Sequence, residues 1–140
     1  MERLVIAAVL VALAVAVALV LDRRRPDAPT STGWAVPSQL DRRDFTRPEA
    51  PWLVGVFTSA TCDACPKVVA KAGPLESPEV AVEEIEYGAQ PDLHRRYAID
   101  AVPCVVIADA EGVVRASFVG LPSATDLWAT LADLRAGSPG

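Results

Sequence analysis

The sequence predicts an α/β fold, a three-layer sandwich with the element order βαβαββα, preceded by one transmembrane helix. Two observations indicate it. Between residues 52 and 135, apolar runs of strand length alternate with segments that carry helical signals. Before them stands an unbroken apolar run, residues 4–21, which begins with Leu4 and ends with Leu21. We therefore expect an N-terminal transmembrane anchor at 1–21, a flexible linker at 22–33 and a folded domain at 34–140.

The N-terminal run contains only Leu, Val, Ile and Ala. As a helix its 18 residues would cover about 27 Å, close to the roughly 30 Å hydrocarbon core of a bilayer. A buried core helix usually keeps some polar positions, and this run has none. The run is therefore interpreted as membrane-embedded.

A cleaved signal peptide is the closest alternative, because Ala14, Ala16 and Ala18 resemble the small residues of a cleavage site. The flanking charges argue against it, since the arginines follow the run, at residues 23–25, instead of preceding it. Positively charged flanks tend to remain cytoplasmic. The sequence thus predicts a single-pass protein of the cell membrane whose residues 22–140 face the cytoplasm, with an extracytoplasmic domain as the alternative.

The remaining composition is that of one ordinary globular domain. Without residues 1–21 the apolar share falls from 51% to about 45%, a usual value, and the length excludes a multidomain enzyme. Residues 26–140 contain 9 Lys and Arg against 16 Asp and Glu. This acidic balance argues against binding to nucleic acid.

The elements of the domain follow from local signals. Apolar runs indicate strands at 52–57 and 104–108, and alternation indicates strands at 80–87 and 113–120. The turn at 109–112 should join the last two strands as an antiparallel hairpin. The expected helices are 38–45, 62–73, 91–97 and 123–135.

Two of these helices have an identifiable cap or apolar stripe. Ser38 should cap the short first helix, and Ser123 should cap the last one. The last helix is expected to bury a stripe of four side chains, Leu127, Trp128, Leu131 and Leu134. Trp128 is therefore interpreted as a core residue.

Three cysteines are present, and Cys62 and Cys65 form a Cys-x-x-Cys pair. Such a pair alone fits a zinc ligand pair, a redox dithiol or coincidence. Its position, directly after a buried strand and at the start of a helix, favours redox chemistry. Free backbone N–H groups and the helix dipole at that place stabilise a thiolate, and the two-residue spacer lets the second thiol resolve a mixed disulfide.

At this point the sequence resembles a known family. The segment WLVGVFTSATCDAC, the following strand and helix, Ala101-Val102-Pro103, the hairpin and the last helix are similar to the thioredoxin fold over residues 35–137. The Phe-x-Ser-x-x-Cys-x-x-Cys pattern resembles that of the membrane-anchored thioredoxin-like proteins. The resemblance implies that Cys62 is the nucleophile and Cys65 the resolving thiol. It also implies that Pro103 is a cis-proline facing them, which leaves the backbone of Val102 free to pair with a substrate.

The sequence departs from soluble thioredoxins at three places. Thr61 stands where that family has Trp, and the spacer contains Asp63, whose charge should partly offset the helix-dipole effect on Cys62. Val56 occupies the position of the carboxylate that assists proton transfer in thioredoxin. Cys104 replaces the Thr that commonly follows the proline, and the resemblance implies that this third sulfur lies near the pair.

Cys104 fits a small apolar filler of a core strand, or else an extra redox partner or metal ligand. With Cys62, Cys65 and His94 it could form a Cys3His zinc set, but His94 lies among charged residues and is expected to be solvated. The pairs at 42–43 and 95–96 are interpreted as solvated arginines. Glu84 and Glu86 should share a face of an edge or surface strand.

These observations predict a membrane-anchored thiol-disulfide oxidoreductase of the thioredoxin type, acting on protein thiols and disulfides through Cys62 and Cys65. No organic cofactor and no metal are implied, because the electrons reside on the two sulfurs. The alternative is a non-catalytic binding module or redox sensor of the same fold, and a metal-binding module comes third.

Overall fold

The computed structural model of the chain describes residues 1–23 and 34–137. The contacts divide the chain into two compact units, one that contains α1 and one that contains every later helix and strand. The first unit is a single helix, α1 (Glu2–Arg23). It continues two residues into the expected linker, and residues 24–33 of that linker lie outside the described residues.

Helix α1 is long and apolar enough to cross a membrane. Its span Glu2–Val20 has a mean hydropathy of 2.8, and none of it is buried inside the protein. A signal sequence near the N-terminus can meet the same requirements of length and hydropathy. The helix therefore fits both interpretations of the N-terminal run.

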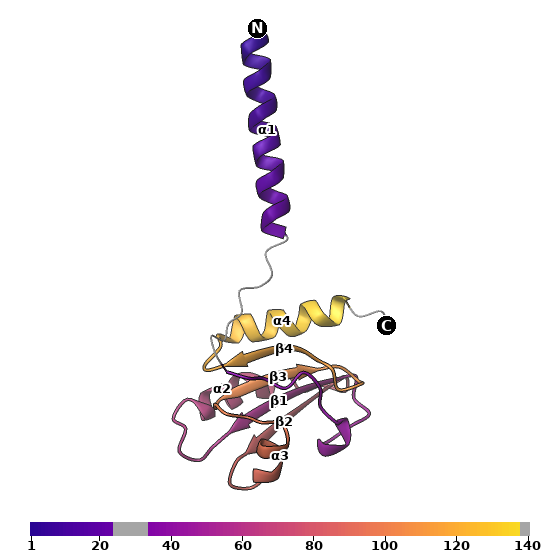
Figure 1. The fold of residues 1–140 in the computed structure, drawn as a ribbon. Coiled ribbons are helices and arrows are strands. Elements are labelled where there is room, and N and C mark those ends of the chain that lie inside the picture. The colour runs from indigo at the N-terminus through magenta and orange to yellow at the C-terminus, as the bar shows by residue number, and fades with distance from the viewer. Residues whose placement is uncertain (24–33, 138–140) are drawn as a thin grey trace. The chain divides into compact units, whose positions relative to one another are not determined.

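The second unit has the element order that the sequence predicts, β-α-β-α-β-β-α, with two short 3-10 helices added (Figure 1). Its elements are η1 (Arg42–Asp44), β1 (Trp52–Thr58), α2 (Cys65–Ala72), η2 (Gly73–Leu75), β2 (Val80–Glu86), α3 (Pro91–Arg96), β3 (Cys104–Ala108), β4 (Val114–Val119) and α4 (Ala124–Gly137).

The four strands form one mixed sheet in the order β2-β1-β3-β4. Strand β1 pairs in parallel with β2, opposite Val80–Glu86, and antiparallel with β3. The pairing of β3 with β4 is antiparallel and forms the expected hairpin. Because β1 and β2 are parallel and β3 runs the other way, the ends of β1 and β2 and the start of β3 meet at one edge of the sheet.

Helices cover the sheet on both faces, which gives the three layers (Figure 1). The buried side chains between the sheet and helices α2 and α4 are Trp52, Val54, Val56, Val68, Ala72, Val80, Val105, Ile107, Leu127 and Leu131. The buried side chains of the opposite face, which α3 covers, include Leu53, Phe57, Ala81, Ile85, Tyr97, Cys104 and Val106. All seven residues of β1 are buried, as expected for a central strand covered on both faces.

Two expected helices differ in extent from the observed ones. In place of a helix over 38–45 capped by Ser38, residues 38–40 pair with the β3–β4 turn and its flank, since the Leu40 N–H donates to the Gly112 carbonyl at 2.8 Å. Only the 3-10 turn η1 remains, and Asp41 caps it. The helix expected over 62–73 begins at Cys65, where Pro66 can occupy the first turn without losing a hydrogen bond.

The last helix begins as predicted, but of the four side chains of its stripe two are buried, Leu134 is partly buried and Trp128 is exposed. The Ser123 hydroxyl accepts a hydrogen bond from the Asp126 N–H at 3.0 Å, which confirms the cap. Leu127 and Leu131 are buried, whereas Trp128 is 44% exposed. The Trp128 indole N–H donates to the Lys71 carbonyl at 2.7 Å, so this side chain joins α4 to α2 at the surface and is not a core residue.

The β3–β4 turn depends on one glycine and one aspartate. Gly112 has a φ of +81°, and a Cβ at this position would lie 2.0 Å from the Leu40 carbonyl oxygen. The Asp109 carboxylate accepts hydrogen bonds from the N–H groups of Glu111 and Val113, both at 3.0 Å. The turn therefore joins β3 to β4 and also binds the segment before η1.

Arg42 is buried, contrary to the expectation of two solvated arginines at 42–43. Its guanidinium donates to the carbonyls of Ala50 and Asp109, each at 2.9 Å, and to that of Arg47 at 3.3 Å. Arg43 meanwhile remains exposed and pairs with Asp41. Arg42 thus satisfies three backbone carbonyls from two loops, which no local sequence signal indicates.

We expect Arg42→Ala to lower the free energy of unfolding by about 2–4 kcal/mol, because it leaves these carbonyls without their charged donor. Arg43→Ala, which removes an exposed ion pair, should change it by about 0.5 kcal/mol or less. Denaturant unfolding of the full chain in detergent, followed by tryptophan fluorescence, measures both. Equal effects of the two variants would contradict the role given to Arg42.

Candidate active site

The two cysteines of the motif lie in the connection from β1 to α2. They form a disulfide, with 5.4 Å between their Cα atoms. Cys62 is partly exposed in the loop before α2, whereas Cys65, the first residue of the helix, is 2% exposed. Cys62 is therefore the more accessible cysteine of the pair.

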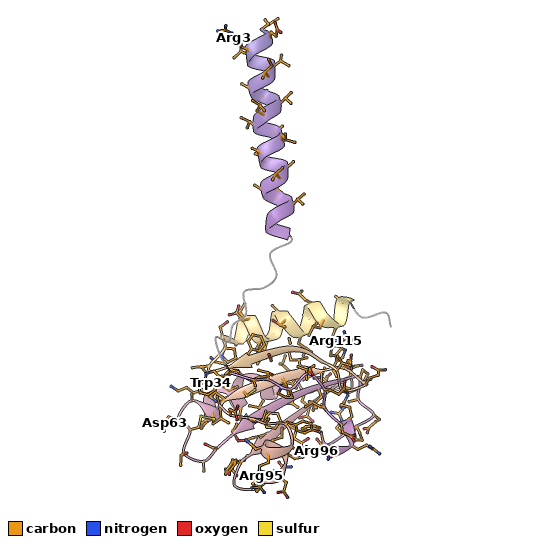
Figure 2. All side chains as sticks on the ribbon, in the orientation of Figure 1. Arg3, Trp34, Asp63, Arg95, Arg96 and Arg115 are labelled. Atoms are coloured by element: carbon orange, nitrogen blue, oxygen red, sulfur yellow. A yellow bond between two sulfur atoms is a disulfide. The ribbon has the colours of Figure 1, made fainter. Side chains whose placement is uncertain are left out.

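The loop itself is shaped by turns that precede the helix. The Cys62 N–H donates to the Ser59 carbonyl at 3.2 Å, and the Cys65 N–H donates to the Cys62 carbonyl at 3.4 Å. Cys62 thus stands just before the first helical turn, where the positive end of the helix dipole acts on it. Asp63 is exposed in the spacer, and Figure 2 shows it on the outer side of this loop.

The structure places Pro103 at the same edge of the sheet. The Val102–Pro103 peptide bond is cis, the geometry that the resemblance implied. The next residue, Cys104, begins β3 and pairs in register with Phe57 of β1. Within residues 34–137, Val102 makes no hydrogen bond to another backbone group, whereas the Pro103 carbonyl accepts from the Gly120 N–H at 2.9 Å.

Cys104 is a free thiol and is 2% exposed. It belongs to the core cluster of the α3 face, whereas helix α2 covers the other face. Burial raises the pKa of the Cys104 thiol to about 11. This environment supports the interpretation of Cys104 as a small apolar filler of the core.

His94 is buried, contrary to the expected solvated position. It is 3% exposed, its Nε2 lies 2.8 Å from the Ile85 carbonyl oxygen, and its ring packs edge-on against Phe57 and Tyr87. The sequence misled here because the charged neighbours of His94 do project outward, as Figure 2 shows for Arg95 and Arg96. One face of the short helix α3 is charged and the other packs on the sheet.

The four residues considered as a zinc set are not assembled into one. In the described part of the chain, no group of three or more His, Cys, Asp and Glu side chains could hold a metal ion. Cys62 and Cys65 share a disulfide, while Cys104 and His94 lie buried on the α3 face.

Two carboxylates on β2 contact the end of β1 and the loop after it, a role that no local sequence pattern indicates. Val56 is buried and apolar, but the Thr58 hydroxyl donates to the Glu84 carboxylate at 2.8 Å. The Glu86 carboxylate accepts from the Ala60 N–H at 3.2 Å, two residues before Cys62. The signal available in the sequence was the alternation of strands and helices, which predicts parallel strands. The observed parallel pairing of β1 and β2 brings their carboxyl ends together.

An open pocket of about 680 Å³ lies away from the dithiol loop. It is lined by residues of the η1 segment, of α3 and of the β3–β4 turn, among them Leu40, Tyr97 and Glu111. That turn follows β3 at the end of the strand opposite to Cys104. The pocket therefore shares no residue with the dithiol loop, and the chemistry of the cysteines places the candidate active site at Cys62 and Cys65.

Comparison with known proteins finds similar proteins that are described as thioredoxins. No protein-family model matches the chain. Over 83 residues the chain is 36% identical to a protein of Methanothermobacter thermautotrophicus described as "Probable Thioredoxin", and the match covers 57% of this chain and 92% of that protein.

Two solved structures have a similar fold. Fasciola hepatica thioredoxin matches with a TM-score of 0.55 and 22% identity, over 65% of this chain and 88% of that one. Mitochondrial thioredoxin 3 of Saccharomyces cerevisiae, in its oxidized form, matches with a TM-score of 0.52 and 20% identity, over 61% of this chain and 81% of that one.

The raised pKa of Cys104 predicts selective labelling of the reduced protein. At pH 7 to 8 we expect a thiol-alkylating reagent to modify Cys62 but not Cys104, because a buried thiol with a pKa of about 11 has almost no thiolate there. Peptide mass spectrometry measures each site, and all three cysteines should react in denaturant. Labelling of native Cys104 as fast as Cys62 would contradict the burial.

Proposed function

The chain belongs to the thioredoxin superfamily, and we propose from this premise that it exchanges disulfides with protein partners while anchored to a membrane by α1. A thioredoxin-like fold with Cys62 and Cys65 at disulfide distance gives the chain a thiol–disulfide redox function. The observation that carries the proposed exchange is the unequal exposure of the two cysteines. Cys62 is open to a partner and Cys65 is buried behind it.

The exchange proceeds in two balanced steps. The Cys62 thiolate attacks one sulfur of a partner disulfide, forms a mixed disulfide and releases the first partner thiolate, which takes a proton from water. Cys65 then loses its proton to water and attacks the Cys62 sulfur, which leaves the Cys62–Cys65 disulfide and releases the second partner thiolate, and this thiolate takes up a proton from water. Two electrons move from the dithiol to the partner, and oxidation of a partner dithiol is the reverse sequence.

Pro103 supports the same role. It lies at the edge of the sheet where β1 ends, and Val102 before it has no backbone partner in the described domain. An extended partner segment could therefore add its backbone hydrogen bonds at Val102 and bring its disulfide to Cys62. Proline has no N–H, so the position itself contributes no competing donor.

A redox sensor that only switches a membrane-bound partner is the second candidate. One observation favours it: Val56 is buried and apolar, so no carboxylate stands on β1 behind the dithiol. Deprotonation of buried Cys65 then lacks a base on that strand. A sensor would be oxidised once per dithiol, whereas an oxidoreductase turns over.

The membrane anchor is supported by α1 and by the charges beside it. Its apolar span, Glu2–Val20, is long enough for a bilayer, and three arginines follow at residues 23–25. These arginines favour a domain on the cytoplasmic side. That compartment keeps thiols reduced, so the dithiol would act there as a reductant.

Replacing the nucleophile should abolish catalysis. We expect Cys62→Ser to bring the reduction of a model protein disulfide, such as that of insulin with dithiothreitol, down to the uncatalysed rate. Cys104→Ala should retain activity, because its buried thiol lies outside the dithiol loop. Turnover is measured as disulfides reduced per chain. An active Cys62→Ser variant would refute the assignment, and one event per chain in the unmodified protein would support the sensor.

The orientation predicts the behaviour of a reporter fused after Gly140. An enzyme that is active only in the cytoplasm should be active in this fusion, and one that requires export should be inactive. Moving the arginines of residues 23–25 to the other end of α1 should reverse both results. A fusion active only outside the membrane would overturn the cytoplasmic orientation.

A further inference from the structure

We propose that Glu86 is a positioning residue of the dithiol: its carboxylate holds the backbone of the loop that presents Cys62, and its charge limits the thiolate form of Cys62. The inference rests on the proposed function, because it concerns how the same pair is controlled. It assigns to β2, which contains no cysteine, a part in the reactivity of the pair that follows the neighbouring strand β1.

The register of the sheet places Glu86 beside the dithiol loop. Glu86 is the last residue of β2 and pairs with Thr58, the last residue of β1. One residue later the Tyr87 N–H still donates to the Thr58 carbonyl at 2.9 Å. The segments that follow β1 and β2 therefore separate only beyond these residues. Cys62 follows Thr58 by four positions.

The Glu86 carboxylate connects the two segments that follow β1 and β2 after they separate. One oxygen, Oε1, accepts from the Ala60 N–H at 3.2 Å, and the other, Oε2, accepts from the Ala89 N–H at 2.8 Å. Gly88 leaves room for this carboxylate, since a Cβ there would lie 3.0 and 3.2 Å from its oxygens. A single side chain thus ties the loop before Cys62 to the turn before α3.

These N–H groups also keep the carboxylate charged. Hydrogen bonds from the backbone of Gly88, then Ala89 and Ala60, lower the pKa of Glu86 below its ordinary value. The charge and the tie are present at neutral pH and are lost only as the pH falls through this lowered pKa. Glu86 is therefore a fixed negative charge at every pH where a thiol exchanges.

The Glu86 carboxylate contacts the loop backbone two residues before Cys62, so its charge acts there against the positive end of the helix dipole. Like charge disfavours the thiolate, so Glu86 raises the pKa of the Cys62 thiol and lowers the share of attacking thiolate at neutral pH. The other charged groups of this edge are Asp63 in the spacer, Glu84 on β2, Lys67 on α2 and His94 behind β2. Among the carboxylates of this edge, it is Glu86 that accepts a hydrogen bond from the loop backbone between Thr58 and Cys62.

The test compares Glu86→Gln with Glu83→Gln. Both variants remove one charge from β2, but Glu83 accepts from the Thr46 N–H at 2.8 Å and makes no hydrogen bond to the dithiol loop. Each full-length variant is reduced in detergent, and the alkylation rate of Cys62 by iodoacetamide is measured from pH 5 to 10. The midpoint of this profile gives the pKa of Cys62 without requiring any exchange activity.

We expect Glu86→Gln to increase the acid dissociation constant of Cys62 about two- to threefold, because solvent screens this carboxylate, and Glu83→Gln to leave it unchanged. Equal shifts in the two variants, or no shift in Glu86→Gln, would overturn the inference. Should the unmodified chain reduce no disulfide while this shift is still present, the proposed function would fail and the role of Glu86 would stand.

A second measurement separates the tie from the charge. Glutamine keeps one acceptor oxygen, whereas Glu86→Ala removes both, so amide hydrogen exchange at Ala60 and Ala89 should be fastest in Glu86→Ala. Far-UV circular dichroism confirms that each variant is folded. Unchanged exchange at Ala60 in Glu86→Ala would show that the carboxylate does not hold the loop.

Discussion

The domain depends on one constraint, the complete burial of β1 between its neighbours. All seven residues of this strand are buried, it pairs on both sides, and helices cover both of its faces. A strand held in this way ends at a fixed place, so the loop that follows Thr58 starts from a rigid support. The antiparallel β3 and the parallel β2 then bring Pro103 and Glu86 to the same edge.

The two faces of the sheet differ in how they are stabilised. The α2 and α4 face is an apolar core, and its helices are linked at the surface where Trp128 donates to the Lys71 carbonyl. The α3 face contains polar side chains with specific partners. His94 meets the Ile85 carbonyl, the Tyr97 hydroxyl accepts from the Asp41 N–H and donates to Asp44, and Arg42 joins two loops. Such satisfied polar contacts fix the loops around a small core.

The order of the elements and the position of the dithiol could be predicted from the sequence, because strand alternation, the 109–112 turn and the Cys-x-x-Cys spacing are local patterns. The burial of Arg42 and His94 could not be predicted, since each looks like its charged neighbours in the chain. Their partners, the Asp109 and Ile85 carbonyls, lie 67 and 9 residues away. The exposure of Trp128 could not be predicted either, because the apolar stripe of a helix does not show how far the surface against which the helix packs extends.

The reactivity of the pair follows from environments that the motif alone does not specify. A thiolate in an apolar environment is unfavourable, so burial of Cys65 opposes its ionisation while partial exposure of Cys62 permits it. With Val56 apolar, the acidic side chains near the pair lie on β2 and in the spacer instead of on β1. They oppose the thiolate of Cys62, whereas a base behind Cys65 would assist its deprotonation. The same fold can therefore hold both sulfurs of the pair in place and, in the proposed mechanism, still moderate Cys62, because the residue beside the end of β1 is a glutamate.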